Sequence, residues 1–220
     1  MNRHLAQRRG FTLVEMLVVI SVILVLSTLA MSGFRSAMNM SRSAKCMGNL
    51  RQLGEGILLY AADNNNFLPP AYISGNNGPD NNWYYAIYPY LTGGTKMPYD
   101  WGQETVIVGR GVFHCPEVKN NDAAYILPWI SYKMNGQFQF LSATGVMSMA
   151  AISKPSQTLL LGEGRAHPKF SSYTSKDQGT GLWYPHNGKL NGLFLDGHIE
   201  SQTESELKSR WTQIGSFSLN

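Results

Sequence analysis

Hydrophobic and polar positions divide the chain into an apolar N-terminal stretch and a mixed remainder. The first ten residues are polar and basic. Residues 11–34 are then almost entirely apolar, with Glu15 as the one charged side chain and no proline. As a helix, residues 11–34 would rise roughly 36 Å, which is enough to cross a bilayer core of about 30 Å. The pattern therefore predicts a membrane-spanning helix.

After residue 34 the apolar side chains recur at three- and four-residue spacing between polar ones. This rhythm is typical of an amphipathic helix. Gly54 and Gly56 are expected to weaken its end, and the run Asp63-Asn64-Asn65-Asn66 is expected to stop it. We predict one continuous helix over 11–62, roughly 78 Å long, whose outer half lays one face on a globular head.

From residue 63 onward, short segments alternate with turn-forming residues. Asn135-Gly136 and Asp196-Gly197 are predicted to be two-residue hairpin turns with positive φ. Thr203 and Glu206 have the spacing of a capping box for a last helix. The predicted fold class is α+β, one long helix packed on a small antiparallel sheet. The predicted strands are 105–108, 111–115, 130–134, 137–141, 158–163, 193–195 and 198–201, with short helical segments over 83–91 and 147–152.

Composition and charge argue against a disordered chain and against a nucleic-acid-binding protein. A chain of 220 residues with 43% hydrophobic and 15% charged residues suits one compact domain plus an appendage. The formal charge of +4 falls to about +1 once Arg3, Arg8 and Arg9 are set aside. No basic patch remains that would indicate nucleic-acid binding. The three arginines also favour a cytoplasmic N-terminus and an exported head.

Glu15 separates three interpretations of the apolar stretch. A secretory signal peptide would be cut after Thr28-Leu29-Ala30, and a plain anchor would not be cut. Neither explains a carboxylate near the start of the span, which is costly in lipid and needs a partner. Cleavage between Gly10 and Phe11 would supply one, because the new α-amino group could pair with Glu15 of its own or a neighbouring helix.

The residues around this junction, RGFTLVE from Arg9 to Glu15, resemble the processing motif of type IV prepilins and type II secretion pseudopilins. The resemblance implies cleavage after Gly10 by a prepilin peptidase, N-methylation of Phe11, and a role for Glu15 in aligning subunits. It also implies four regions. These are a leader at 1–10, a transmembrane and filament-core helix at 11–34, the amphipathic half of the helix at 35–62, and a head at 63–220.

A second motif lies near the C-terminus, where His186 is followed after nine residues by Asp196-Gly197. It resembles the prepilin-associated H-X9-DG head family, in which the role of the motif is unknown. Other parts of the chain that agree with this family are 49–54, 113–116, 131–135 and Glu163.

The same His186 and Asp196, with His198, Glu200 or Glu163, could bind a divalent cation, and calcium is the candidate suggested by the pseudopilin class. The structural alternative is that Asp-Gly serves backbone geometry and that His186 hydrogen-bonds this turn or a carbonyl. Calcium prefers several oxygen ligands, so we expect no metal and no other cofactor, with calcium as the alternative.

Cys46 and Cys115 are the two cysteines. By themselves they are too few for a disulfide scaffold or a structural zinc site. In an oxidising compartment a bridge between them would staple the helix to the sheet and stabilise the fold by roughly 4 kcal/mol. Two buried thiols or an intermolecular bridge are the alternatives.

These observations predict a structural subunit rather than an enzyme, since the sequence has no P-loop, no G-x-S-x-G and no paired metal motif. Its expected partners are a prepilin peptidase, other pilin or pseudopilin subunits and an inner-membrane assembly platform. Its expected location is the bacterial inner membrane, with a periplasmic head, and then a periplasmic or cell-surface filament. The alternative is a membrane-anchored periplasmic module that binds a metal or glycans. An aromatic platform for glycans would use Trp83, Tyr84, Tyr85, Tyr88, Tyr90, Trp101, Trp129, Trp183 and Tyr184.

Overall fold

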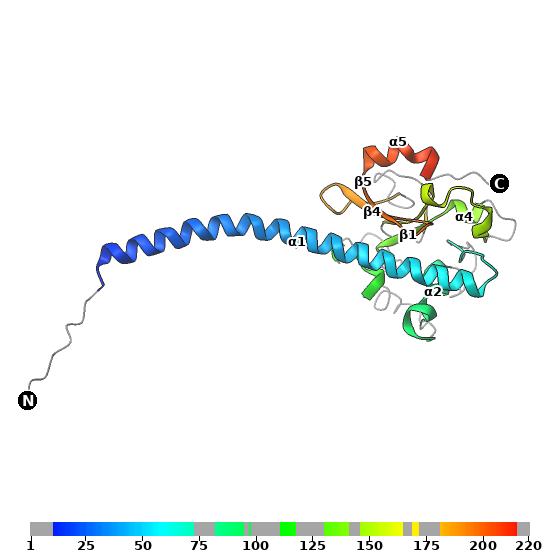
Figure 1. The fold of residues 1–220 in the computed structure, drawn as a ribbon, viewed down its shortest axis with the longest axis horizontal. Coiled ribbons are helices and arrows are strands. Elements are labelled where there is room, and N and C mark those ends of the chain that lie inside the picture. The colour runs from blue at the N-terminus through cyan, green and yellow to red at the C-terminus, as the bar shows by residue number, and fades with distance from the viewer. Residues whose placement is uncertain are drawn as a thin grey trace, which may run out of the picture. The chain divides into compact units, whose positions relative to one another are not determined.

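The computed structural model describes residues 11–72, 82–94, 97, 111–117, 130–140, 146–164, 169–171 and 181–214. The chain divides into two compact units, one up to Ser41 and one from Arg42 onward. A single helix, α1 (Leu13–Asp63), contributes to both units (Figure 1). The other elements are α2 (Trp83–Thr92), η2 (Gly111–Phe113), β1 (Tyr132–Asn135), α4 (Gln137–Phe140), η3 (Met149–Ala151), η4 (Pro155–Gln157), β2 (Leu159–Glu163), β3 (Lys169–Phe170), β4 (Lys189–Phe194), β5 (Ile199–Thr203) and α5 (Glu204–Ile214).

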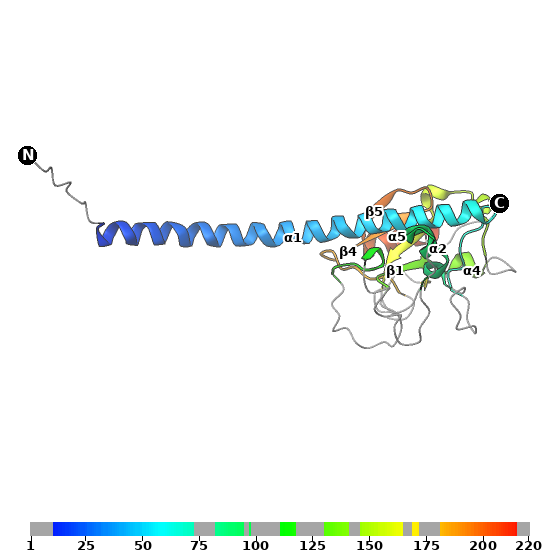
Figure 2. The same cartoon turned by 90° about the horizontal axis from the view of Figure 1, so that it is seen from below.

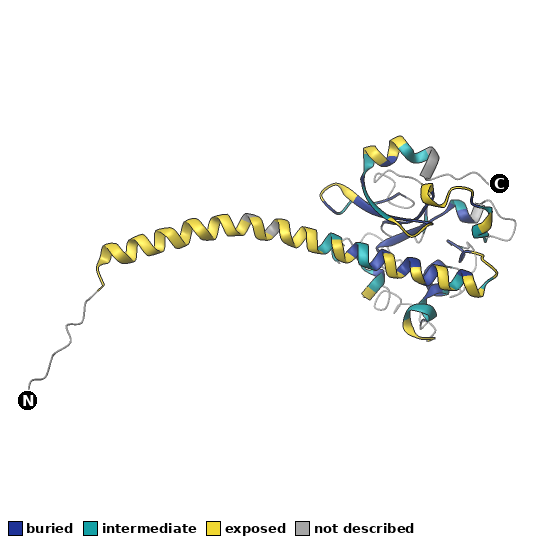
Figure 3. Cartoon of the chain, in the orientation of Figure 1, coloured by how far each residue is buried: buried dark blue, intermediate teal, exposed yellow. Residues whose placement is uncertain are grey.

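The first unit consists of the N-terminal part of α1. Its large apolar side chains are exposed; Leu13, for example, is 81% exposed and Leu29 is 67% exposed (Figure 3). Within the described part of the chain, α1 is the one helix that is long and apolar enough to cross a membrane, judged by length and composition. The predicted helix over the apolar stretch is therefore present, and its apolar surface needs an environment other than water.

The second unit is built on a five-stranded sheet with the order β3-β1-β2-β4-β5. Three of its strand pairs are antiparallel, as predicted: β1 with β2, β2 with β4, and β4 with β5. The fourth corrects the prediction of a purely antiparallel sheet, because β3 pairs in parallel with β1 through Met134 and Asn135. The α+β class of one long helix on a small sheet is confirmed.

Helices cover both faces of this sheet (Figures 1 and 2). On one face, Leu50, Leu53 and Ile57 of α1 join α2 and the strands in one core cluster. On the other face, Leu207 of α5 belongs to a second cluster with Phe170, Leu182 and Phe194. From Cys46 onward the amphipathic pattern thus marks the face of α1 that is buried in the head, whereas Met40, earlier in the same pattern, is exposed.

Two glycines near the end of α1 have a different role from the predicted one. A Cβ on Gly54 would lie 2.7 Å from Leu193 Cδ2, and one on Gly56 would lie 3.1 Å from Leu91 Cδ2. These glycines let the helix approach β4 and α2 closely. The helix continues past them and ends at Asp63, followed by Asn65 and Asn66 at φ values of 52° and 62°. The predicted stop at the asparagine run is confirmed.

Several local predictions are wrong. Residues 111–115 contain the short helix η2 instead of a strand, and the 137–141 strand is replaced by α4 over Gln137–Phe140. Asn135-Gly136 is not a hairpin turn, because Asn135 Oδ1 accepts a hydrogen bond from Gln137 N at the start of α4. Neither of these two residues has a positive φ. The predicted strand 105–108 lies outside the described residues.

Candidate functional site

The N-terminal residues of the predicted processing motif form a helix cap. Glu15 Oε2 accepts hydrogen bonds from Thr12 N at 2.8 Å and Thr12 Oγ1 at 2.9 Å, and Glu15 N donates to Thr12 Oγ1 at 3.2 Å. This reciprocal arrangement is a capping box. The Thr-x-x-Glu spacing from Thr12 to Glu15 is the sequence pattern of such a cap. The sequence interpretation treated Glu15 only as a charge in an apolar span and did not predict the cap. Phe11 is 75% exposed, and Gly10 lies outside the described residues.

A second set of predicted residues lies inside the head, where the helix meets the sheet. Cys46 of α1 and Cys115, just after η2, form a disulfide with their Cα atoms 5.4 Å apart. Both cysteines are 0% exposed. The bridge joins residues separated by 69 positions and so ties α1 to the segment that precedes β1.

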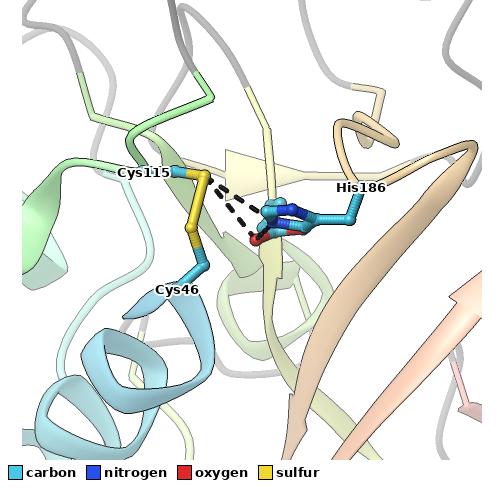
Figure 4. Close-up of side chains that lie close together, drawn as sticks. Cys46, Cys115 and His186 are labelled. Carbon is cyan, nitrogen blue, oxygen red and sulfur yellow. Dashed lines mark hydrogen bonds and ion pairs between the residues drawn. A yellow bond between two sulfur atoms is a disulfide. The ribbon is translucent and has the colours of Figure 1, made fainter. Parts of the chain in front are cut away.

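Next to the disulfide lies a buried pair of titratable side chains. Glu163, the last residue of β2, is 0% exposed, and its Oε1 lies 2.7 Å from His186 Nε2. Asn191 of β4 donates to the same carboxylate, from its backbone N to Oε2 at 2.8 Å and from Nδ2 to Oε1 at 3.3 Å. Cys115 Sγ lies 3.7 Å from His186 Nε2 and 3.9 Å from Glu163 Oε1, and Figure 4 shows His186 directed toward the disulfide.

Burial dominates the electrostatics of this cluster. Removal from water raises the pKa of Glu163 above its usual value, although the hydrogen bonds from His186 and Asn191 oppose the rise. The pKa of Tyr132, which lies opposite Glu163 in the β1–β2 register, is also raised, first by burial and then by the charge of Glu163. A charged carboxylate here is therefore costly unless a cation or further donors accompany it.

A polar layer continues from this cluster toward the helix. Asn49 of α1 donates from Nδ2 to His114 O at 2.9 Å and to Tyr132 Oη at 3.2 Å, and Tyr132 Oη donates to Cys46 O at 3.5 Å. Most of the segments that resemble the H-X9-DG family thus meet in one place, from Asn49 in α1 to His186 before β4. The sequence interpretation placed Glu163 at a strand end but did not predict that Asn49, Tyr132 and Asn191 join it.

The H-X9-DG spacing corresponds to one strand between two tight turns. His186 and Lys189 exchange backbone hydrogen bonds of 3.0 Å around Asn187 and Gly188, whose φ values are 52° and 79°. β4 follows, and Gly197, at φ 92°, then turns the chain into β5. The His186 ring therefore does not bond the Asp196 turn. Instead, Asp196 Oδ1 accepts from His198 N at 3.2 Å and lies 2.6 Å from His198 Nδ1.

The cation ligands considered from sequence separate into different pairs. His186 lies with Glu163, Asp196 lies with His198, and Glu200 lies 2.9 Å from Arg210 Nη1. Among the described residues, the one group of His, Cys, Asp or Glu that could hold a metal ion is Cys46, Cys115, Glu163 and His186.

The aromatic residues of α2 pack inward. Trp83, Tyr84 and Tyr85 are buried, and the Trp83 ring lies 6.2 Å from that of Phe113. These three residues contribute to the core and not to an exposed platform. Trp101 and Trp129 lie outside the described residues.

Comparison with known families gives two matches. Residues 5–31 match the family model of the prokaryotic N-terminal methylation motif. Residues 35–96 match the model of a family described as a protein of unknown function, DUF1559. The two matches support a type IV pilin-like or pseudopilin-like protein. Neither a curated protein nor a solved structure matches the chain.

The match to the methylation motif begins at residue 5 and covers most of the apolar part of α1. The motif indicates a subunit that a prepilin peptidase processes, and together with the apolar helix it is consistent with a membrane anchor. Pilin-like families are structural and not catalytic. The second match covers the amphipathic part of α1, which carries Cys46 and Asn49, and extends through α2.

Proposed function

We propose that this chain is a structural pilin-like subunit that assembles through its N-terminal helix into a filament of a type II secretion or type IV pilus-like machine. Residues 11–34 first hold it in the inner membrane, with the N-terminus cytoplasmic and the head periplasmic. A prepilin peptidase removes residues 1–10, and Phe11 becomes N-methylated.

The observation that carries this proposal is an apolar helix surface that the chain itself leaves uncovered. Large side chains from Phe11 to Phe34 are exposed, most of them by more than half. A lipid bilayer covers such a surface before assembly, and neighbouring helices cover it afterwards. In both environments Glu15 is the exception that needs a partner.

The helix cap supports the proposed role of Glu15. Its carboxylate already lies 2.8 Å from Thr12 N, which directly follows Phe11 in the chain. Cleavage before Phe11 would create an α-amino group one residue from this position. A positively charged amine, from the same helix or from a neighbouring one, would neutralise the carboxylate in the apolar surroundings.

The N-terminus of the mature chain tests the processing step. The full chain, expressed in bacteria together with a prepilin peptidase, should yield a first peptide that begins with N-methylated Phe11 in mass spectrometry. Gly10→Val should leave the leader attached, whereas Gly33→Ala, at a glycine with nothing within 4 Å of an added Cβ, should be processed normally. A mature N-terminus near Met31 would show that residues 1–30 are an ordinary signal peptide and would overturn the proposal.

A further inference from the structure

The disulfide and the Glu163–His186 pair together place four metal-binding atoms in one buried spot. The ligand atoms of Cys46, Cys115, Glu163 and His186 all lie within 4.8 Å of one another. They come from α1, the segment after η2, the end of β2 and the turn before β4. Two sulfurs, one imidazole nitrogen and one carboxylate oxygen form a donor set that suits Zn²⁺.

The distances approach those of a tetrahedral zinc site. With Zn–S near 2.3 Å and Zn–N and Zn–O near 2.1 Å, the ligand atoms of a tetrahedron lie about 3.4 to 3.8 Å apart. Cys115 Sγ is 3.7 Å from His186 Nε2 and 3.9 Å from Glu163 Oε1. The Nε2 to Oε1 distance of 2.7 Å is that of a hydrogen bond, and it would open by roughly 0.7 Å once both atoms bind an ion.

The surroundings already orient the carboxylate as a metal ligand requires. Asn191 N donates to Glu163 Oε2 at 2.8 Å, and Oε1, which accepts from Asn191 Nδ2 at 3.3 Å, lies 3.9 Å from Cys115 Sγ. Hydrogen bonds of this kind to a ligating carboxylate fix its direction and strengthen metal binding. Glu163 is 0% exposed, so a nearby cation would also offset the cost of burying its charge.

We propose that, when the Cys46–Cys115 disulfide is reduced, the two thiolates bind Zn²⁺ together with His186 Nε2 and Glu163 Oε1. The disulfide and the zinc site exclude each other, because the sulfurs are bonded at about 2.05 Å in the first and lie about 3.8 Å apart in the second. Two cysteines alone are too few for such a site, and the fold supplies the remaining two ligands.

The exchange between the two forms is balanced. A dithiol reductant gives two electrons and two protons to the disulfide and becomes a disulfide itself, which leaves two Cys thiols. Zn²⁺ then displaces both thiol protons and forms two Zn–S bonds. A disulfide oxidant reverses the sequence: it takes two electrons from the thiolates, forms the Cys46–Cys115 bond and releases the ion.

Either state joins the same parts of the head. The disulfide links α1 to the segment before β1, and the zinc site would link both to β2 and to the turn before β4. A newly exported chain that is not yet oxidised would therefore keep the helix on the sheet through the ion. This proposal concerns the head and does not depend on whether the N-terminal helix forms filaments.

Cobalt binding to the full chain tests the proposal, because Co²⁺ replaces Zn²⁺ and absorbs light. The chain is unfolded in urea with a phosphine reductant, and then refolded in detergent micelles with one equivalent of Co²⁺. We expect one ion per chain, a thiolate-to-cobalt charge-transfer band and the visible bands of a tetrahedral ion, all of which Zn²⁺ abolishes. The same procedure without reductant should give no such bands.

Substitutions test which side chains bind the metal ion. His186→Ala and Glu163→Gln should each weaken binding about tenfold or more, and His186→Cys should restore it with a stronger charge-transfer band. His198→Ala, at the exposed histidine that pairs with Asp196, should bind as the wild type does. Circular dichroism of each oxidised variant checks that it folds.

Two results would overturn the proposal. One is a reduced wild-type chain that shows no thiolate-to-cobalt band. The other is a binding constant that His186→Ala and Glu163→Gln leave unchanged, which would show that the ion is held by thiols of an unfolded chain.

Discussion

At the scale of single residues, one carboxylate in the described part of the head is removed from water completely. Glu163 is 0% exposed and receives hydrogen bonds from His186 and Asn191, yet burial still raises its pKa. His186 therefore acts on Glu163 and not on the Asp196-Gly197 turn, which begins ten positions later in the chain. The histidine of the H-X9-DG motif is thus explained by a partner that lies outside the motif.

The raised pKa of Glu163 predicts how stability depends on pH. Between pH 4.5 and the raised pKa, Glu163 is protonated in the folded chain and ionised in the unfolded chain. The contribution of this group to the free energy of unfolding is therefore complete below about pH 4.5 and is lost as pH rises through the raised pKa. Glu163→Gln is neutral throughout. Its free energy of unfolding relative to the wild type should therefore increase as pH rises above 4.5, which urea unfolding at several pH values measures.

Glu200 provides a control of opposite sign. Burial acts to raise its pKa, but hydrogen bonds from Arg210 and Gln202 outweigh this and lower it. The stabilisation from this carboxylate is present above its usual pKa and is lost as pH falls. Glu200→Gln should thus lose stability relative to the wild type at higher pH. Identical pH profiles for the two variants would contradict at least one of the two assignments.

The disulfide gives a second prediction at the residue scale. Cys46→Ser should lower the free energy of unfolding by about 4 kcal/mol, because the bridge closes a loop with a sequence separation of 69. Urea unfolding of the full chain in detergent, without reductant, measures this. Wild type treated with reductant and a metal chelator should fall to the same value. Equal stability of wild type and Cys46→Ser without reductant would show that the bridge contributes nothing.

At the scale of elements, the packing of α1 on the sheet depends on where its glycines lie. An added Cβ on Gly54 would meet Leu193 Cδ2 at 2.7 Å, whereas one on Gly48, in the same helix, would meet nothing within 4 Å. Gly54 therefore allows close packing against Leu193, whereas Gly48 only lowers the helix propensity of α1. Helix propensity alone cannot distinguish them.

Alanine at these two glycines should have opposite effects. Gly48→Ala should stabilise the chain by roughly 0.5–1 kcal/mol through helix propensity. Gly54→Ala gains the same term but overpacks the core by about 1–3 kcal/mol, so it should be the less stable variant. Thermal unfolding of both variants in the same detergent measures the difference. A Gly54→Ala variant as stable as Gly48→Ala would show that Leu193 moves aside freely.

At the scale of the whole molecule, the head buries its own apolar side chains, whereas the N-terminal part of α1 does not. The head buries its apolar residues on both faces of the sheet, whereas the N-terminal part of α1 leaves its apolar residues exposed. The proposed assembly concerns only the second part. Changes in this helix should therefore alter assembly and leave the stability of the head unchanged.

Glu15→Gln tests this separation. The variant should still insert in the membrane and be cleaved, but it should be lost from sheared surface or periplasmic filaments, because the amine of a neighbouring Phe11 no longer finds a carboxylate. Glu55→Gln, an exposed position on the same helix, should assemble normally. Immunoblots of the filament and membrane fractions measure both. Normal recovery of Glu15→Gln in filaments would contradict the assigned role.

Much of the fold follows from local patterns. Hydrophobic periodicity predicts α1, and the polar run 63–66 predicts its end within one residue of Asp63. The strand β2 is predicted almost residue for residue, because a buried strand is a short apolar run bounded by turns. One failure occurs where tertiary contacts override a local signal. Asn135-Gly136 is a strong hairpin signal, but Asn135 instead accepts a hydrogen bond from Gln137 N at the start of α4 and donates from Nδ2 to Leu159 O.

The apolar helix, the charge within it and the processing motif are each visible in the amino-acid sequence, because each depends on residues close together in the chain. The role of His186 is visible only in the folded head. Its partner Glu163, the donor Asn191 and the two cysteines of the disulfide come from four segments of the chain, and no spacing along the chain encodes their distances. The packing of α1 on the sheet brings these groups together, and their burial makes their charges matter.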